Sequence, residues 1–318
     1  MRRKIEVSMK SILTLLVFCI SPFAQAAEPV KTQMKVTPLS IREEWSAPSE
    51  EISGIKIWKN NLYLASDNTM DIYRFPWKSS DSGAKRLDLT ATDKNTLVLN
   101  PATGKKKKKK KQKKSQWEAI TVDSDGSVFL LNEAKDELHV FASDGKATKT
   151  FKLKSAESRK KDEKGFEGLL LLKSSHIIAA LTEPPMLIEF GPEGEQALGL
   201  SGDTLLGDEE VFSLAKGDTL HALQSWTLSS ESGCEFADLA TEKSKVFALL
   251  KDCNRVIELP ALTAKQTEFS AVQSWTIPQS VSHPEGLQSL GDEGFLVASD
   301  VRAIEKNVFW LVPAKANP

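Results

Sequence analysis

The sequence has almost no net charge, few histidines and few cysteines, and each shortage limits what the protein can do. Its formal net charge is −1 over 318 residues, which argues against a specific nucleic-acid partner and against general attraction to an anionic membrane. No Gly-x-Ser-x-Gly elbow, phosphate-binding glycine loop or histidine-rich metal motif is present. The four histidines, His139, His176, His221 and His283, are scattered along the chain. The sequence therefore offers none of these catalytic motifs.

Residues 1–26 have the pattern of a secretory signal peptide. Basic residues precede the apolar run 12–20, and Ala24-Gln25-Ala26 ends the segment as a cleavage site would. The run is shorter than the roughly 20 residues that cross a bilayer. We therefore predict cleavage after Ala26 and a periplasmic or secreted protein, with an uncleaved anchor as the alternative.

Two cysteines, Cys234 and Cys253, remain after that cleavage. They are equally distant from a predicted turn at 242–245, so they would face each other across a hairpin. In an oxidising compartment this arrangement predicts a disulfide, and two buried thiols are the alternative. The spacing excludes a C-x2-C metal pair.

A short motif recurs five times and organises the rest of the chain. Each copy opens an apolar strand, followed by a short turn, a second apolar strand and an acidic residue. The copies are Ile52-Ser53-Gly54-Ile55, Trp117-Glu118-Ala119-Ile120, Phe166-Glu167-Gly168-Leu169, Phe236-Ala237-Asp238-Leu239 and Pro284-Glu285-Gly286-Leu287. A unit of roughly 50 residues repeated in this way predicts an all-β fold, a five-bladed β-propeller.

The segments between and around the motifs complete this prediction. The lead segment 27–50 contains a strand-like stretch, 36–41, which we expect to complete the last blade and close the ring, leaving no open sheet edge. The propeller would span 51–313, with a tail at 314–318. The long interval between the third and fourth motifs is assigned to an outer hairpin of blade three, with strands at 211–214 and 219–223.

A lysine-rich loop, 105–114, lies between the first two motifs. Its like charges repel one another and cannot pack, so we predict a solvated loop. Docking to an anionic surface is the functional alternative.

Acidic residues recur at two positions of the repeat. The motif supplies Glu118, Glu167 and Glu285, where the other copies have Ser53 and Ala237, and Asp238 is one residue off. At the end of the second strand every repeat has a carboxylate: Asp67, Glu133, Glu183, Asp252 and Asp300. Both positions lie at the same edge of an antiparallel hairpin, so ring closure would gather them around one mouth of the central channel.

This clustering predicts a cation site. Crowded carboxylates raise one another's pKa unless a cation compensates. Hard oxygen donors without histidine or cysteine suit calcium better than a transition metal. A cationic or polyhydroxylated ligand and simple capping of turns are the alternatives. Trp117, His283 and Ser53 lie at or beside the acidic positions and are candidate ligand-binding residues.

With these motifs the chain resembles the SdiA-regulated (YjiK-like) propellers. The resemblance rests on the motif copies, except the fourth, and on Leu62–Asp67, and it runs from about Glu51 to Val312. The gluconolactonase-like group and the phytase-like esterases share the Pro-Glu-Gly-Leu element. The resemblance implies an extracytoplasmic five-bladed propeller with no established reaction, whose calcium would be held by Glu118, Glu167, Glu285 and their acidic neighbours. The cleavable signal, the lysine loop and Ala237 depart from that family.

These features together predict a periplasmic or secreted monomer that binds calcium and a ligand or protein partner at its acidic mouth. A metal-dependent hydrolase of the lactonase, esterase or phosphoesterase type is one alternative. A non-catalytic interaction scaffold is the other. Fold alone does not decide among them, so catalysis is left open.

Overall fold

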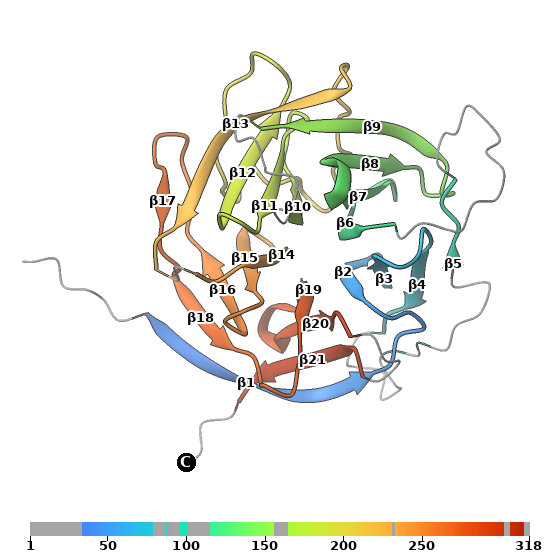
Figure 1. Ribbon diagram of the computed structural model, residues 1–318, viewed down its shortest axis with the longest axis vertical. Helices are drawn as coiled ribbons and strands as arrows, with labels where there is room; N and C mark the ends of the chain where they lie inside the picture. The colour runs from blue at the N-terminus through green and yellow to red at the C-terminus, as the bar shows by residue number, and fades with distance from the viewer. Residues whose placement is uncertain are drawn as a thin grey trace, which may run out of the picture. The chain divides into compact units, whose positions relative to one another are not determined.

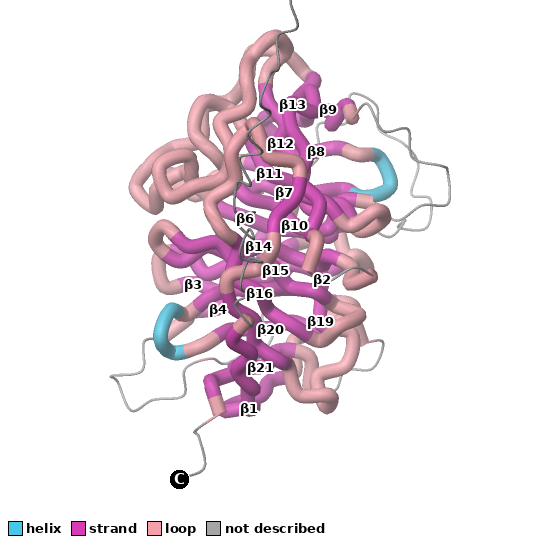
Figure 2. Tube along the Cα trace, turned by 90° about the vertical axis from the view of Figure 1, so that its left-hand side faces the viewer, coloured by secondary structure: helices cyan, strands magenta, loops and turns pink. Residues whose placement is uncertain are grey.

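A computed structural model describes residues 34–78, 87, 89, 96–100, 115–155, 165–230, 233–301 and 306–314. The predicted signal peptide, the lysine-rich loop and nearly all of the tail lie outside these residues. The described chain is built from strands, with short 3-10 turns at Glu133–Lys135 and Gly291–Glu293 (Figure 2). No helix within it is long and apolar enough to cross a membrane. The all-β prediction is confirmed.

The strands form five antiparallel groups along the chain. The first contains β2 (Ile52–Trp58), β3 (Asn61–Ser66), β4 (Ile72–Pro76) and β5 (Thr96–Leu97). The second contains β6 (Trp117–Val122), β7 (Val128–Asn132), β8 (Glu137–Phe141) and β9 (Ala147–Lys154). The third contains β10 (Phe166–Leu171), β11 (Ile177–Leu181), β12 (Met186–Gly191) and β13 (Thr219–Leu228).

Of the last two groups, the fifth draws strands from both ends of the described chain. The fourth contains β14 (Phe236–Glu242), β15 (Lys245–Leu250), β16 (Arg255–Leu259) and β18 (Gln273–Thr276). The fifth contains β19 (Pro284–Ser289), β20 (Phe295–Ser299), β21 (Val308–Pro313) and β1 (Lys35–Trp45). The strand β1 also pairs in parallel with β18, as β13 does with β9 and with β17 (Glu268–Phe269).

The first strand of each group lies innermost (Figure 1). These inner strands contact one another in a closed cycle: β2 with β6, β6 with β10, β10 with β14, β14 with β19, and β19 with β2. They carry near-continuous apolar runs because they are covered on both faces, as in β10, where every residue is buried. Five apolar clusters fill the spaces around and between the groups. The fold is therefore propeller-like.

The prediction of an outer hairpin in the third group is wrong for one of its two strands. The stretch 219–223 belongs to β13, but 211–214 forms no strand. The chain from 200 to 212 instead runs along the hairpin turns of the second and third groups. Leu206 donates its N–H to the carbonyl of Leu171, and Phe212 donates to Asp123 Oδ2 at 3.0 Å.

Candidate functional site

Each inner strand carries a β-bulge at the position of the recurring motif. The register of the five inner hairpins shifts across one residue in every case, and the skipped residues are Ser53, Glu118, Glu167, Ala237 and Glu285. A bulge bends its strand and re-aims a side chain. The five motif residues therefore share one local geometry at the same end of their strands.

Glycine after the bulge allows the inner strands to approach one another closely. A Cβ atom at Gly54 would lie 2.9 Å from the backbone nitrogen of Ile120, and one at Gly286 would lie 3.0 Å from Cγ2 of Ile55. Both distances are too short for an undisturbed side chain at these positions. The glycines therefore permit the packing that brings carboxylates of different strands together.

The bulged glutamates meet around one lysine. Lys251 Nζ lies 2.6 and 2.8 Å from the carboxylate oxygens of Glu167 and 3.4 Å from Glu285 Oε1. Glu235 lies 4.0 Å from the same ammonium. We call Glu118, Glu167, Glu285 and Lys251 the acidic mouth.

Burial and crowding raise the pKa of these carboxylates. Burial raises the pKa of Glu167 to about 7, against the lowering effect of Lys251. Burial raises the pKa of Glu285 too. Glu118 has a pKa well above the ordinary value because of burial and the nearby carboxylates of Glu133, Glu167, Glu285 and Asp67. Burial lowers the pKa of Lys251, but the surrounding carboxylates raise it further, so the amine stays charged.

Three more predicted carboxylates lie near the acidic mouth. Asp67 and Glu133 act on Glu118, and Asp300 acts on Glu285. Glu133 also accepts the backbone N–H of Gly165 at 2.6 Å. The structure thus brings together six of the nine carboxylates that the repeat pattern assigned to a metal site: Asp67, Glu118, Glu133, Glu167, Glu285 and Asp300.

The other three carboxylates have different surroundings. Asp238 is buried and accepts backbone N–H groups of Leu239 and Leu287, each at 2.8 Å, so it ties β14 to β19. Glu183 and Asp252 are exposed and lie in turns. Glu183 and Asp252 therefore stand apart from the six gathered carboxylates, whereas Glu167 also acts electrostatically on Asp238.

The predicted ligand-binding residues are dispersed. Trp117 is 2% exposed and packs edge-to-face against His139 and Phe141. Ser53 is buried, and its hydroxyl donates to the carbonyl of Glu51 at 3.5 Å. His283 is exposed, and its carbonyl accepts the N–H of Asp300 at 2.9 Å. Ligand contact by these three residues stays a prediction.

Sequence reasoning missed Lys251, although the repeat contains a signal for it. The residue before the second acidic position is short, polar and buried in four repeats: Ser66, Asn132, Thr182 and Ser299. Three of these bond loop carbonyls, as Asn132 does with Ser115 at 2.7 Å. In the fourth repeat this place is taken by Lys251, whose long side chain reaches the glutamates instead.

The predicted disulfide is confirmed and lies beside Lys251. Cys234 and Cys253 are bonded, with Cα atoms 5.6 Å apart. Lys251 donates its backbone N–H to the carbonyl of Glu235 at 3.0 Å, next to Cys234. The disulfide therefore holds the turn after Lys251 against the start of β14. Such bonds are typical of oxidising compartments, which indicates a non-cytoplasmic protein.

Lys251 already engages two of the carboxylates of the acidic mouth, Glu167 and Glu285. In the described part of the chain, no group of three or more His, Cys, Asp or Glu side chains is placed to hold a metal ion. The ammonium of Lys251 stands between Glu167 and Glu285, where it takes the oxygen atoms that calcium would use. Calcium binding stays a prediction.

Comparison with known proteins identifies one family whose model spans half of the chain. The sequence model of the phytase-like family, described as esterase-like activity of phytase, matches residues 47–205. No curated protein matches the chain.

Among solved structures, glutaminyl cyclase from Myxococcus xanthus is similar with 11% identity and a TM-score of 0.48, covering 88% of this chain and 97% of the cyclase. Virginiamycin B lyase from Staphylococcus aureus is similar with 9% identity and a TM-score of 0.37, covering 85% and 74%. Neither likeness says what this chain does.

Proposed function

The chain belongs to the phytase-like family, and on this basis we propose that it is a hydrolase-type propeller that cleaves esters at the acidic mouth. One observation carries the proposal: the ammonium of Lys251 lies beside buried glutamates that the repeated bulges bring together. This arrangement supplies both a fixed positive charge and proton-transfer groups, which ester hydrolysis needs.

The two kinds of group have separate roles in this proposal. Lys251 stabilises the negative charge that develops on the carbonyl oxygen when water attacks an ester. Glu118 takes the proton from the attacking water and returns it to the departing alcohol, because burial and the neighbouring carboxylates raise its pKa and so make it a stronger base than an ordinary glutamate. Glu167 and Glu285 hold the ammonium in place.

We extend the proposal to the architecture and its setting. Each antiparallel group is one of five blades, and β1 completes the last blade. The cyclic contacts of the inner strands and the pairing of β1 with β21 support this count. By its motifs the chain also resembles the SdiA-regulated (YjiK-like) propellers. A secreted or periplasmic location agrees with the disulfide. Monomeric state and docking through the lysine-rich loop stay predictions.

Calcium binding with ligand recognition is the second candidate function. Glu118 has no hydrogen bond or ion pair among the described residues and is repelled by its acidic neighbours. A divalent cation beside it would relieve that repulsion without displacing Lys251 from Glu167. The site would then recognise a ligand through the ion, with no ester cleavage required.

Hydrolysis of p-nitrophenyl acetate by the purified protein tests both candidates. We expect Glu118→Gln to lower kcat/KM by about 10²–10⁴-fold, the usual contribution of a proton-transfer group. Lys251→Met should lower it as well, because the carbonyl oxygen loses its positive partner. The exposed Glu193→Gln is the matched control and should keep the wild-type rate.

The same assay distinguishes the candidates when it is run with EDTA and with added calcium. Hydrolysis that is insensitive to both reagents and lost in Glu118→Gln supports the first candidate. Full activity in a folded Glu118→Gln variant contradicts it. Calcium-dependent stabilisation of a protein that does not hydrolyse the ester supports the second candidate.

A further inference from the structure

A polar cavity of about 620 Å³ lies at the turn ends of the inner strands, away from the bulged ends that form the acidic mouth. Its walls come from β2, β14 and β19 and from the segment 202–208, which the repeat pattern did not anticipate. That segment is fixed in place, because Leu205 pairs with Leu172 and Leu206 bonds Leu171. The cavity is therefore built partly by an addition to the propeller-like core.

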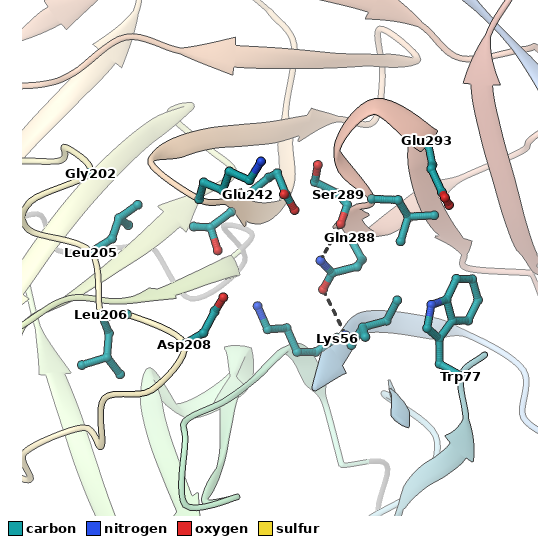
Figure 3. Close-up of a pocket in the computed structure, with 15 residues that line it drawn as sticks. Lys56, Trp77, Gly202, Leu205, Leu206, Asp208, Glu242, Gln288, Ser289 and Glu293 are labelled. Atoms are coloured by element: carbon teal, nitrogen blue, oxygen red, sulfur yellow. Dashed lines mark hydrogen bonds between the residues drawn. The ribbon is translucent and has the colours of Figure 1, made fainter. Parts of the chain in front are cut away.

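Lys56 of β2 projects into this cavity (Figure 3). Its ammonium makes no hydrogen bond or ion pair within the part of the chain that the structure describes. Asp208, Asp238 and Glu242 act on it electrostatically from beyond bonding distance, and burial lowers its pKa. Lys56 is half-buried, and an ammonium that is partly withdrawn from water gains from a direct anionic partner. An anionic group entering the cavity would supply the missing partner.

The wall beside Lys56 is fixed by hydrogen bonds. Gln288 Oε1 accepts the backbone N–H of Ile57 at 3.0 Å, and its Nε2 donates to the carbonyl of Ser289 at 2.8 Å. Both bonds engage the amide with the main chain, so this side of the cavity has little freedom to collapse. A preformed cavity with few charged groups is typical of a ligand site.

The charges around the cavity select among ligands. Asp208, Glu242 and Glu293 line it together with Lys56 and Lys243, and Asp208 points into the same space as Lys56 (Figure 3). A purely anionic ligand would be repelled by these carboxylates, and a purely cationic ligand would be repelled by Lys56. A molecule that carries both charges satisfies both sides.

We propose that this cavity binds a zwitterion of short-peptide size, with its carboxylate on Lys56 and its ammonium between Asp208 and Glu242. The volume is within the range of about 300–1,000 Å³ found for small-molecule sites and exceeds what one amino acid fills. The site is separate from the acidic mouth and does not depend on ester hydrolysis.

Binding of triglycine, measured by calorimetry and by thermal unfolding, tests the proposal. Triglycine should bind the wild-type protein and raise its unfolding temperature. Triglycinamide, which lacks the carboxylate, and N-acetyltriglycine, which lacks the ammonium, should each bind about tenfold to a hundredfold more weakly. These arms use the wild-type protein and so remain valid if a variant fails to fold.

Variants of Lys56 and Asp208 then test which residue binds the carboxylate and which binds the ammonium of triglycine. Lys56→Met should weaken triglycine binding to the level of triglycinamide, whereas the exposed Lys265→Met should have no effect. Asp208→Asn should weaken triglycine binding but leave N-acetyltriglycine unchanged. Without ligand, Lys56→Met should unfold at the same or a higher temperature, because it removes a desolvated charge that has no direct partner.

Two results would overturn the proposal. The first is no binding of triglycine at millimolar concentration, or equal binding of the three peptides. The second is a clear loss of stability in ligand-free Lys56→Met, which would show that the ammonium serves as a structural counter-charge to Asp208, Asp238 and Glu242.

Discussion

His176 is a fully buried histidine held between two carboxylates. Its Nδ1 lies 2.7 Å from Glu189 and its Nε2 lies 2.8 Å from Glu195, and Glu189 is equally buried. Burial lowers the pKa of His176, but the hydrogen bonds and charges of both glutamates raise it further, so the net shift is upward. Its protonated form therefore stabilises the fold.

This shift predicts a pH-dependent cost of removing the imidazole. The folded pKa is raised, so the contribution is fully present below the unfolded value of about 6.5 and is lost as pH rises through the folded pKa. We expect His176→Gln to reduce the free energy of unfolding by about 3 kcal/mol at pH 5.5 and by less at pH 9. Urea unfolding of both proteins at several pH values measures this gap.

The difference in the free energy of unfolding between the wild-type protein and His176→Gln isolates the contribution of His176. The buried carboxyl groups with raised pKa, such as Glu118 and Asp238, also weaken the fold as pH rises, but they do so in both proteins. A gap that stays constant or widens with rising pH would mean that His176 is not protonated in the fold.

At this scale the repeat pattern grouped nine carboxylates, of which six gather at the acidic mouth, and it did not reveal their cationic partners. The acidic positions follow from the repeat, because one register places them at one strand end. Lys56 occurs in a single repeat, so no periodicity marks it. Lys251 is marked only as a departure from the repeat, because the other four copies have a short polar residue at its position. The partners of the two lysines come from distant strands, and only the folded chain defines those neighbours.

At the scale of elements, the approach between inner strands depends on small residues after the bulge. The Cβ atom of an alanine at residue 54 would meet the main-chain nitrogen of Ile120 at 2.9 Å, and a backbone atom cannot move aside as a side chain can. We therefore expect Gly54→Ala to lower the free energy of unfolding by about 1–3 kcal/mol, the usual range for overpacking. Chemical denaturation measures the loss.

Gly217 supplies a matched control for that substitution. Its Cβ position meets only the nitrogen of Thr219, at 4.0 Å, so Gly217→Ala should be close to neutral. Equal stability of the two variants would show that the inner strands do not need this close approach.

The sequence predicted strands correctly where both faces of the strand are buried. The prediction failed for 211–214, which is held in place by a few separate contacts. The inner runs are largely apolar and buried, as in Leu169–Leu171 of β10, because neighbouring groups cover them on each side. The stretch 211–214 is also apolar, yet Val211 and Leu214 are exposed and only Phe212 is buried, against Phe129. An apolar pattern alone therefore did not distinguish a strand from a segment held across turns.

At the scale of the whole molecule, the arrangement of the inner strands was predictable but the long interval between repeats was not. The repeat period predicted units that pack side by side, and the inner strands do contact one another in a cycle. The period could not reveal what the long interval before β13 does, since the segment 202–208 has no counterpart in the other repeats. That segment forms part of the cavity that Lys56 lines.

The strand β1 allows a direct test of ring closure. It pairs with β21 from Leu39↔Pro313 to Trp45↔Val308 and with β18 from Lys35↔Gln273 to Pro38↔Thr276. If β1 completes the last blade, its amide hydrogens should exchange only when the whole domain unfolds, with the same free energy as those of β20. Native-state hydrogen exchange in dilute denaturant measures both, and the two-residue β5 should exchange more easily as an internal control. Exchange of β1 at a clearly lower free energy than β20 would mean that the strand frays independently and that the ring closes without it.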